Sequence, residues 1–330
     1  MNLLVFLMEL FNRLIDPTTY EPIIRRKTAL LRFLSRILGS KARIAASITI
    51  TIMIVAFALY RMPRTGSSPA QGTTGITWEQ AGGGIIRISG IHTTLPITGG
   101  ELIMDSTTIR FVTKNNYNLQ GCHILNVPNG FNTKVIFPDG TVVWLNAGSR
   151  LLIPADFGYK KRELFLEGEG FFDIAPDPRK LLTIHNGQAD ILALGTSLNI
   201  NSYGNNMKVS LVEGSIIVSL RDKKTQLKAG QELIMDKTTG QMAVDTFNQS
   251  YALGWIQGRY NTSGQTMEEV RAVLIRWYNV NIVFDNPDLA KQLYNGAFSR
   301  SEPLETFLNN LKISGYLDYD IDSDGTVHLK

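Results

Sequence analysis

The chain has 330 residues, of which 44% are apolar and 19% are charged, and its formal net charge is +4. This length corresponds to about two domains, and the composition excludes wholesale disorder. The single cysteine, Cys122, excludes an intrachain disulfide framework and a cysteine-based zinc site, and the four histidines are not at metal-ligand spacing.

The positive charge is concentrated near the N-terminus. Residues 1–43 contain eight basic and three acidic side chains, and residues 44–60 contain none. Residues 61–330 contain 25 basic and 26 acidic side chains. A nucleic-acid-binding protein would spread its basic charge over a folded face, so direct DNA binding is not expected.

Residues 1–43 are expected to form a short helical segment. A first amphipathic helix covers residues 1–15 and ends at Asp16-Pro17, and a second, basic helix covers roughly residues 23–38. A segment of 43 residues is too short to bury its own apolar surface. A partner or the membrane must therefore cover that surface. The apolar side chains expected to bind that partner are Leu3, Leu7, Leu10, Phe11 and Leu14.

Residues 44–60 form an uncharged apolar run, which predicts one transmembrane helix. As a helix the run would be about 26 Å long, close to the roughly 30 Å of a hydrocarbon core. A buried helix of a soluble protein is the alternative, but no compact domain precedes the run to bury it. A cleaved signal peptide is disfavoured by the 43 residues before the run. The basic excess on the N-terminal side predicts that this side is cytoplasmic.

Residues 61–120 are expected to form a linker and a β-rich leader, and residues 121–246 an all-β domain. Short apolar runs recur about every ten residues without helices between them, which is typical of a sandwich or a solenoid. Pro138-Asp139-Gly140 predicts a tight hairpin. Glu167-Gly168 and Glu213-Gly214 begin similar segments 46 residues apart, a weak internal repeat.

Trp144 is predicted to be a structural residue of the domain core rather than a ligand platform. It follows the hairpin on a strand in which Val142, Trp144 and Asn146 share one face. The motif residues expected to have structural roles are Pro138, Asp139, Gly140, Trp144, Asn146, Glu167, Gly168, Glu213 and Gly214.

Residues 255–330 contain a clearer repeat, which predicts two βαβ units in tandem. Helices are expected from Met267 and from Leu304, 37 residues apart, and similar strands precede and follow each helix. The two units are expected to make one small sheet with helices on one face. The final strand, Thr326, Val327, His328, Leu329 and Lys330, is predicted to be a free edge that contacts a receptor by strand addition.

The chain contains no pattern that indicates catalysis, a cofactor or a metal. Asp320, Asp322, Asp324 and Gly325 match the start of a calcium loop, but its final acidic ligand would lie beyond the chain, so a hairpin turn is favoured. The acidic residues Glu163, Glu167, Glu169 and Asp173 are at strand spacing and are expected to form a solvated face. The chain is therefore not expected to be an enzyme.

Several motifs in order closely resemble the signature of FecR-type anti-sigma factors. They are VPNG at 127–130, FPDGTVVWLNAGS at 137–149, LEGEGFF at 166–172, DPRK at 177–180, GTSLN at 195–199, LVEG at 211–214 and LKAGQ at 227–231. The C-terminal residues resemble the secretin and TonB N-terminus-like domain that follows many of these proteins, and this match includes Trp255, Trp277-Tyr278, Phe298-Ser299 and Pro303-Leu304-Glu305. Together the matches cover roughly residues 121–330.

The resemblance implies a mostly β protein that spans the inner membrane once, with its N-terminus in the cytoplasm and its C-terminus in the periplasm. Its expected partners are an extracytoplasmic-function sigma factor, the signalling domain of a TonB-dependent outer-membrane transporter, membrane lipid and intramembrane proteases. Residues 1–43 supply fewer helices than the family usually has. A start further upstream, a reduced binding surface and a lost role therefore remain alternatives. The rival class is a membrane-anchored periplasmic binding or assembly protein without a sigma partner.

Overall fold

The computed structural model describes residues 75–88, 92–105, 107–113, 120–158 and 162–330. All of them belong to one compact unit, Pro69–Lys330. We divide them into a β domain, residues 75–246, and a C-terminal module, residues 249–330. The cytoplasmic segment and the span predicted for residues 44–60 lie outside the described residues. Within the described part of the chain, no helix is long and apolar enough to cross a membrane.

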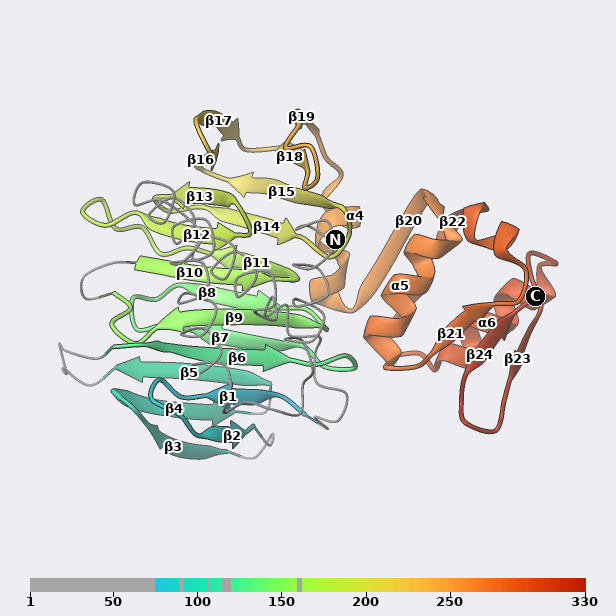
Figure 1. The fold of residues 1–330 in the computed structure, drawn as a ribbon, viewed down its shortest axis with the longest axis horizontal. Helices are drawn as coiled ribbons and strands as arrows, with labels where there is room; N and C mark the ends of the chain where they lie inside the picture. Colours follow the sequence, from blue (N-terminus) through green and yellow to red (C-terminus); the bar gives the residue numbers. More distant parts are fainter. Residues whose placement is uncertain (1–74, 89–91, 106, 114–119, 159–161) are drawn as a thin grey trace, which may run out of the picture. The chain divides into compact units, whose positions relative to one another are not determined.

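The β domain contains two open sheets (Figure 1). In spatial order the first sheet has nine strands, β17 (Lys223–Lys228), β16 (Ser215–Leu220), β13 (Ala189–Ala193), β12 (Leu182–Asn186), β10 (Arg162–Glu167), β9 (Ser149–Pro154), β6 (Cys122–Val127), β1 (Thr77–Glu79) and β2 (Ile85–Arg87). The second sheet has ten strands, β19 (Met242–Thr246), β18 (Gln231–Asp236), β15 (Asn206–Glu213), β14 (Ser197–Asn201), β11 (Glu169–Asp173), β8 (Val142–Leu145), β7 (Thr133–Ile136), β5 (Thr108–Thr113), β4 (Gly100–Asp105) and β3 (Thr93–Ile97). The predicted β-rich leader thus contributes β1 to β5 to the same two sheets.

The chain passes repeatedly from one sheet to the other, and the two Glu-Gly motifs mark two of these crossings. Gly168 connects β10 to β11 with φ +93°, and Gly214 connects β15 to β16 with φ +90°. A Cβ atom on Gly168 would lie 2.6 Å from Ser149 Oγ, and one on Gly214 would lie 2.6 Å from Thr196 Cγ2. Glycine is therefore required by backbone conformation and by space. The weak internal repeat therefore corresponds to two glycine bends that cross between the sheets in opposite directions.

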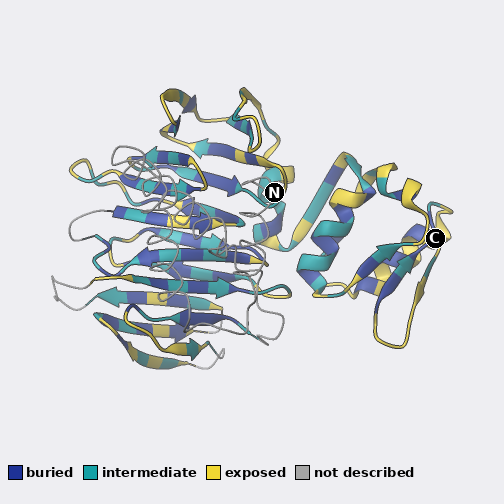
Figure 2. Ribbon diagram, viewed as in Figure 1, coloured by how far each residue is buried: buried dark blue, intermediate teal, exposed yellow. Residues whose placement is uncertain are grey.

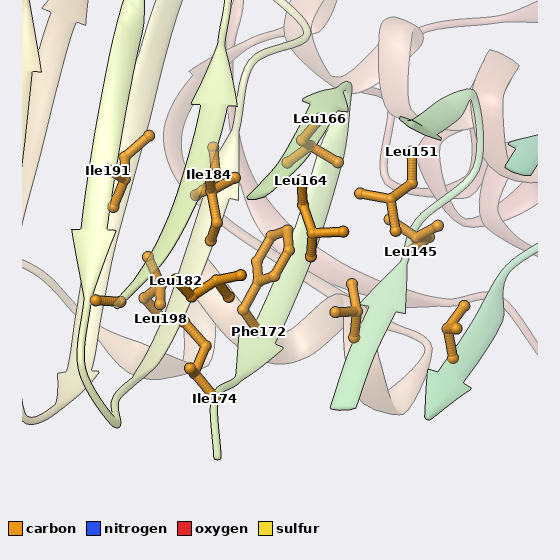
Figure 3. Packing of buried hydrophobic residues seen from close by; sticks show 14 of the residues in the cluster. Leu145, Leu151, Leu164, Leu166, Phe172, Ile174, Leu182, Ile184, Ile191 and Leu198 are labelled. Atoms are coloured by element: carbon orange, nitrogen blue, oxygen red, sulfur yellow. The ribbon is translucent and has the colours of Figure 1, made fainter. Parts of the chain in front are cut away.

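One hydrophobic core lies between the two sheets. Alternate residues of most strands are buried, as the period-two pattern of the sequence predicts (Figure 2). Leu164 and Ile184 from the first sheet are fully buried with Phe172 and Leu198 from the second (Figure 3). The prediction of a mostly β protein is confirmed.

The C-terminal module follows the predicted order of strands and helices. Its elements are α4 (Gln249–Leu253), the 3-10 helix η1 (Gly254–Gln257), β20 (Arg259–Thr266), α5 (Met267–Tyr278), β21 (Ile282–Phe284), the 3-10 helix η2 (Pro287–Lys291), β22 (Leu293–Ser299), α6 (Leu304–Ile313), β23 (Tyr319–Ile321) and β24 (Val327–Leu329). Helices α5 and α6 begin at the predicted residues. A capping box, in which Thr266 and Glu269 each bond the other's backbone N–H, starts α5.

The strands of the C-terminal module pair differently from the prediction. They form a two-stranded sheet, β20-β22, and a three-stranded sheet, β21-β24-β23. The single small sheet that we expected is therefore wrong, because strands from the two repeats pair with each other. Tyr260, on the strand before α5, and Phe298, on the strand before α6, are direct cross-strand partners with ring centroids 5.1 Å apart.

The final strand, β24, is not a free edge. It pairs in parallel with β21 and antiparallel with β23, so it is the central strand of its sheet. Val327 is 1% exposed and Leu329 is fully buried. The edge predicted for residues 326–330 is therefore wrong, because chain order does not determine order in a sheet.

Candidate functional site

A buried carboxylate lies on the outer face of the second sheet and is surrounded by three asparagine side chains. Glu169 begins β11 and is only 6% exposed. Its Oε2 accepts a hydrogen bond from Asn146 Nδ2 at 2.8 Å, and its Oε1 accepts from Asn199 Nδ2 at 3.1 Å and from Asn201 Nδ2 at 2.9 Å. Each asparagine lies on or next to a neighbouring strand, so the sheet itself positions the cluster.

Ser149 and Tyr203 continue this cluster. Ser149 Oγ donates to the backbone oxygen of Glu169 at 3.1 Å and accepts from its N–H at 3.0 Å. Tyr203 donates to the backbone oxygen of Ala147 at 2.5 Å, and its hydroxyl lies 2.9 Å from Ser149 Oγ. The cluster therefore joins strands β8, β9 and β11 to the turn after β14.

Burial governs the electrostatics of the cluster. Removal from water raises the pKa of Glu169, and the amide donors of Asn146 and Asn199 and the nearby Arg276 act in the opposite direction. Burial also raises the pKa of Tyr203, and the charge of Glu169 raises it further. With both carboxylate oxygens accepting hydrogen bonds, Glu169 is suited to hold neighbouring groups in place.

The C-terminal module contacts this cluster directly. Trp255 Nε1 donates to Asn199 Oδ1 at 3.1 Å. The guanidinium of Arg276 lies 3.9 Å from the ring centroid of Tyr203. The backbone oxygen of Arg276 accepts a hydrogen bond from the N–H of Gly130 at 2.7 Å. We call this contact the junction, formed by Gly130, Glu169, Asn199 and Tyr203 of the β domain with Trp255 and Arg276 of the module.

Apolar side chains extend the junction. Ala147 belongs to the hydrophobic cluster of the C-terminal module, and Trp144 and Phe171 are partly buried against it. The rings of Trp144 and Phe171 are 5.5 Å apart, and Lys134 Nζ lies 4.8 Å from the centre of the Trp144 ring. The motifs FPDGTVVWLNAGS and LEGEGFF thus both contribute residues that meet the module.

The structure corrects two expectations about these residues. Trp144 is not in the core of the β domain, because Val143 and Leu145 point inward and Trp144 lies on the outer face. Glu169 is not on a solvated face, although Glu167 and Asp173 are exposed as expected. Both expectations failed because the C-terminal module packs against the outer face of the second sheet, which the strand pattern alone does not predict.

A second buried charge, missed by the sequence analysis, holds the predicted hairpin. Pro138-Asp139-Gly140 connects β7 to β8 as expected, with Gly140 at φ +88°. Nη2 of Arg162, on β10, lies 2.7 Å from Oδ2 of Asp139. The same nitrogen donates to Thr141 Oγ1 and to the backbone oxygen of Ala175. The sequence did contain a signal for this buried charge, because Arg162 has the same inward-facing alternation as Leu164 and Leu166.

The remaining predicted sites have different outcomes. Leu3, Leu7, Leu10, Phe11 and Leu14 lie outside the described residues. The Asp-rich segment forms the favoured hairpin turn, in which the N–H of Thr326 donates to Asp322 Oδ1 and Asp324 Oδ1. Among the residues that the structure describes, no group of three or more His, Cys, Asp or Glu side chains is arranged to hold a metal.

Comparison with known proteins assigns both parts of the chain. The FecR protein family matches residues 124–217, and the FecR C-terminal family matches residues 259–329. A 1.65 Å crystal structure of a "putative anti-sigma factor" from Parabacteroides distasonis is 28% identical and has a TM-score of 0.57. The match covers 63% of this chain and 98% of that one. A 2.50 Å crystal structure with the same description and organism has the same identity and TM-score and covers 62% and 97%.

No curated protein matches the chain. The two family matches and the solved structures define a regulatory, non-enzymatic protein of the anti-sigma factor class. The chain belongs to the FecR family, with a FecR domain followed by the FecR C-terminal domain.

Proposed function

We propose that this chain is a single-pass inner-membrane anti-sigma factor that couples a TonB-dependent outer-membrane transporter to an extracytoplasmic-function sigma factor. Its membership of the FecR family is the observation that carries the proposal. The charge balance supports the topology, because the basic excess precedes the uncharged residues 44–60.

The topology is tested with reporter fusions after residue 75. A reporter that is active only in the periplasm should be active there, and a reporter that is active only in the cytoplasm should be inactive. The reverse pattern would contradict the proposed membrane arrangement and the regulatory role with it.

The cytoplasmic partner is tested by co-purification. The apolar side chains of residues 1–15 require a cover, and truncation of a buried leucine typically costs about 2–5 kcal/mol. Leu7→Ala combined with Leu10→Ala should therefore abolish co-purification of the sigma factor. A complex that survives both changes would exclude this surface. If no sigma factor co-purifies with the unchanged chain, the rival class, a periplasmic binding or assembly protein, would be favoured.

The periplasmic partner is proposed to add a strand to the C-terminal module at a free edge, and β23 offers one. Asp318 and Lys330 exchange backbone hydrogen bonds, and the N–H of Asp322 donates to Thr326. Because the ladder bonds alternate along an antiparallel strand, the N–H of Ile321 faces away from β24. Strand addition at this edge would use that N–H group.

Two proline substitutions separate binding from folding. Ile321→Pro removes an N–H at the free edge and should weaken binding of the transporter's signalling domain while the module stays folded. Val327→Pro removes an N–H of the central strand, β24, that donates to the backbone oxygen of Asn281. This change should unfold the module. Undiminished binding by a folded Ile321→Pro protein would exclude the β23 edge.

A further inference from the structure

The contact between the β domain and the C-terminal module is chemically mixed. It combines one side-chain hydrogen bond from Trp255, one stacked guanidinium from Arg276 and one backbone hydrogen bond from Gly130. Trp144 and Phe171 are only partly buried at this contact. Polar contacts of this kind are typical of domain interfaces that open and close, whereas permanent interfaces are larger and more apolar.

Buried donors without acceptors oppose the closed contact. Arg300 Nη1 and Nη2 and Arg276 Nε are shielded from solvent and have no hydrogen-bond acceptor among the described protein atoms. Burial lowers the pKa of Arg300, and Tyr203 of the β domain acts in the opposite direction. A buried donor without an acceptor is unfavourable, so the closed contact contains a built-in destabilising element.

We propose that the junction is a releasable latch, which holds the C-terminal module on the β domain at rest and opens when a partner binds the module. The identity of that partner rests on the proposed function, whereas the latch itself rests on the contacts above.

Asn199 is one residue through which release would reach the β domain. Its side chain donates to Glu169 and accepts from Trp255, so it belongs both to the buried cluster and to the contact with the module. When Trp255 leaves, Asn199 Oδ1 loses its partner and the Glu169 cluster becomes accessible to water. Release therefore changes the hydrogen bonding of β11 and β14 as well as the position of the module.

A disulfide can lock the latch closed. A Cβ atom on Gly130 would lie 3.4 Å from the Cβ of Asn279, close to the roughly 3.5–4.5 Å of a disulfide. The test chain carries Gly130→Cys and Asn279→Cys, with Cys122→Ser to remove the native thiol. The oxidised protein should fail to respond to the transporter, and reduction should restore the response. A normal response from fully oxidised protein would overturn the proposal.

Substitutions should shift the latch in opposite directions. Arg276→Gln removes the stack on Tyr203 and should raise the ratio of open to closed molecules at least tenfold. Arg271→Gln on the same helix is the matched control, because Arg271 bonds Glu268 and the backbone of Ile282 within the module. Arg300→Met removes the guanidinium that lacks an acceptor and should lower the ratio.

The ratio is measured as the distance distribution between spin labels at Lys224→Cys and Thr306→Cys in the full-length chain with Cys122→Ser. Both positions are exposed. Identical distributions for Arg276→Gln and Arg271→Gln would exclude the latch, and a more open Arg300→Met protein would exclude the role given to the buried donors.

The two proposals can fail separately. Distance shifts as expected in a protein that binds no sigma factor would support the latch and contradict the proposed function. A sigma factor that co-purifies, with a transporter response unaffected by the disulfide, would contradict the latch and leave the proposed function standing.

Discussion

Arg162 is a buried charge that ties the two sheets of the β domain together. It is 3% exposed, projects from β10 of the first sheet, and pairs with Asp139 between two strands of the second sheet. Its guanidinium also donates to the backbone oxygens of Lys180 and Ala175. A buried pair with so many hydrogen bonds is strongly destabilising to break, because the partners left behind have no replacement.

Replacement of Arg162 should therefore be severe. We expect Arg162→Ala to lower the free energy of unfolding by about 3–5 kcal/mol, measured by chemical denaturation of the full-length chain. Arg179→Ala is the control, because the Arg179 side chain is 90% exposed and its ion pair with Asp177 is long at 3.8 Å. Equal effects of the two changes would show that Arg162 does not hold the sheets.

Sequence patterns predicted which residues share a face but not what covers that face. Val142 and Trp144 lie on one face as predicted, and Glu169 lies on the outer face of its own strand. Alternation along a strand depends only on backbone geometry, so it can be seen in the sequence. The burial of Trp144 and Glu169 depends on the C-terminal module, more than 80 residues further along the chain, and no local pattern contains that information.

Among the elements, the bend between β10 and β11 is sensitive to substitution. Gly168 has φ +93°, and an added Cβ would lie 2.9 Å from the backbone Cα of Ser149 as well as against its side chain. We expect Gly168→Ala to destabilise the β domain by about 2 kcal/mol or more, since strain and overlap act together. Gly187→Ala is the control, because its φ is also positive but nothing lies within 4 Å of the added Cβ. Similar unfolding free energies for the two variants would contradict the steric argument.

The three-stranded sheet of the C-terminal module contains a histidine between two carboxylates. His328 on β24 lies 2.8 Å from Asp285 Oδ1 after β21 and 3.3 Å from Asp322 Oδ2 after β23. The hydrogen bond to Asp285, followed by that to Asp322, raises the pKa of His328. The imidazole thus links all three strands through these two contacts.

This raised pKa predicts how module stability depends on pH. Because the folded-state pKa lies above the unfolded value of about 6.5, the contribution is fully present below that pH and is lost as the pH rises through the folded-state pKa. The melting temperature of the module should therefore fall with rising pH in this range. His328→Gln should flatten the profile, and His92→Gln in the β domain should leave it unchanged. A profile that stays the same in His328→Gln would assign the pH dependence to other groups.

The helices of the module were predictable and its strand pairing was not. Thr266 and Glu269 form a capping box, and Pro303 precedes α6, so each helix start has a local signal. The pairing of β20 with β22, and of β24 with both β21 and β23, arises from contacts between repeats. Strands as short as three residues carry too little pattern to choose their neighbours.

For the whole molecule, the order of the domains followed from motifs, and the junction between them required the structure. The FecR motifs identified the β domain, and a separate resemblance to the secretin and TonB N-terminus-like domain identified the C-terminal region. Neither gave a reason for the asparagines at positions 146 and 199. The structure supplies one, since both bind Glu169 and Asn199 also binds Trp255. The signature therefore encodes a docking surface as well as a β fold.

Removal of the C-terminal module should consequently damage the β domain that remains. A chain that ends at residue 248 would expose Trp144 and Phe171 and would open the Glu169 cluster to water. We expect its free energy of unfolding to fall by about 1–3 kcal/mol, from the apolar area that is no longer covered, and its binding of a hydrophobic dye to increase. Trp144→Thr with Phe171→Thr in the shortened chain should reverse the dye binding, because threonine suits an exposed strand. If the shortened chain matches the full-length protein in both measurements, the module does not stabilise the β domain, and the surface that meets it would need another explanation.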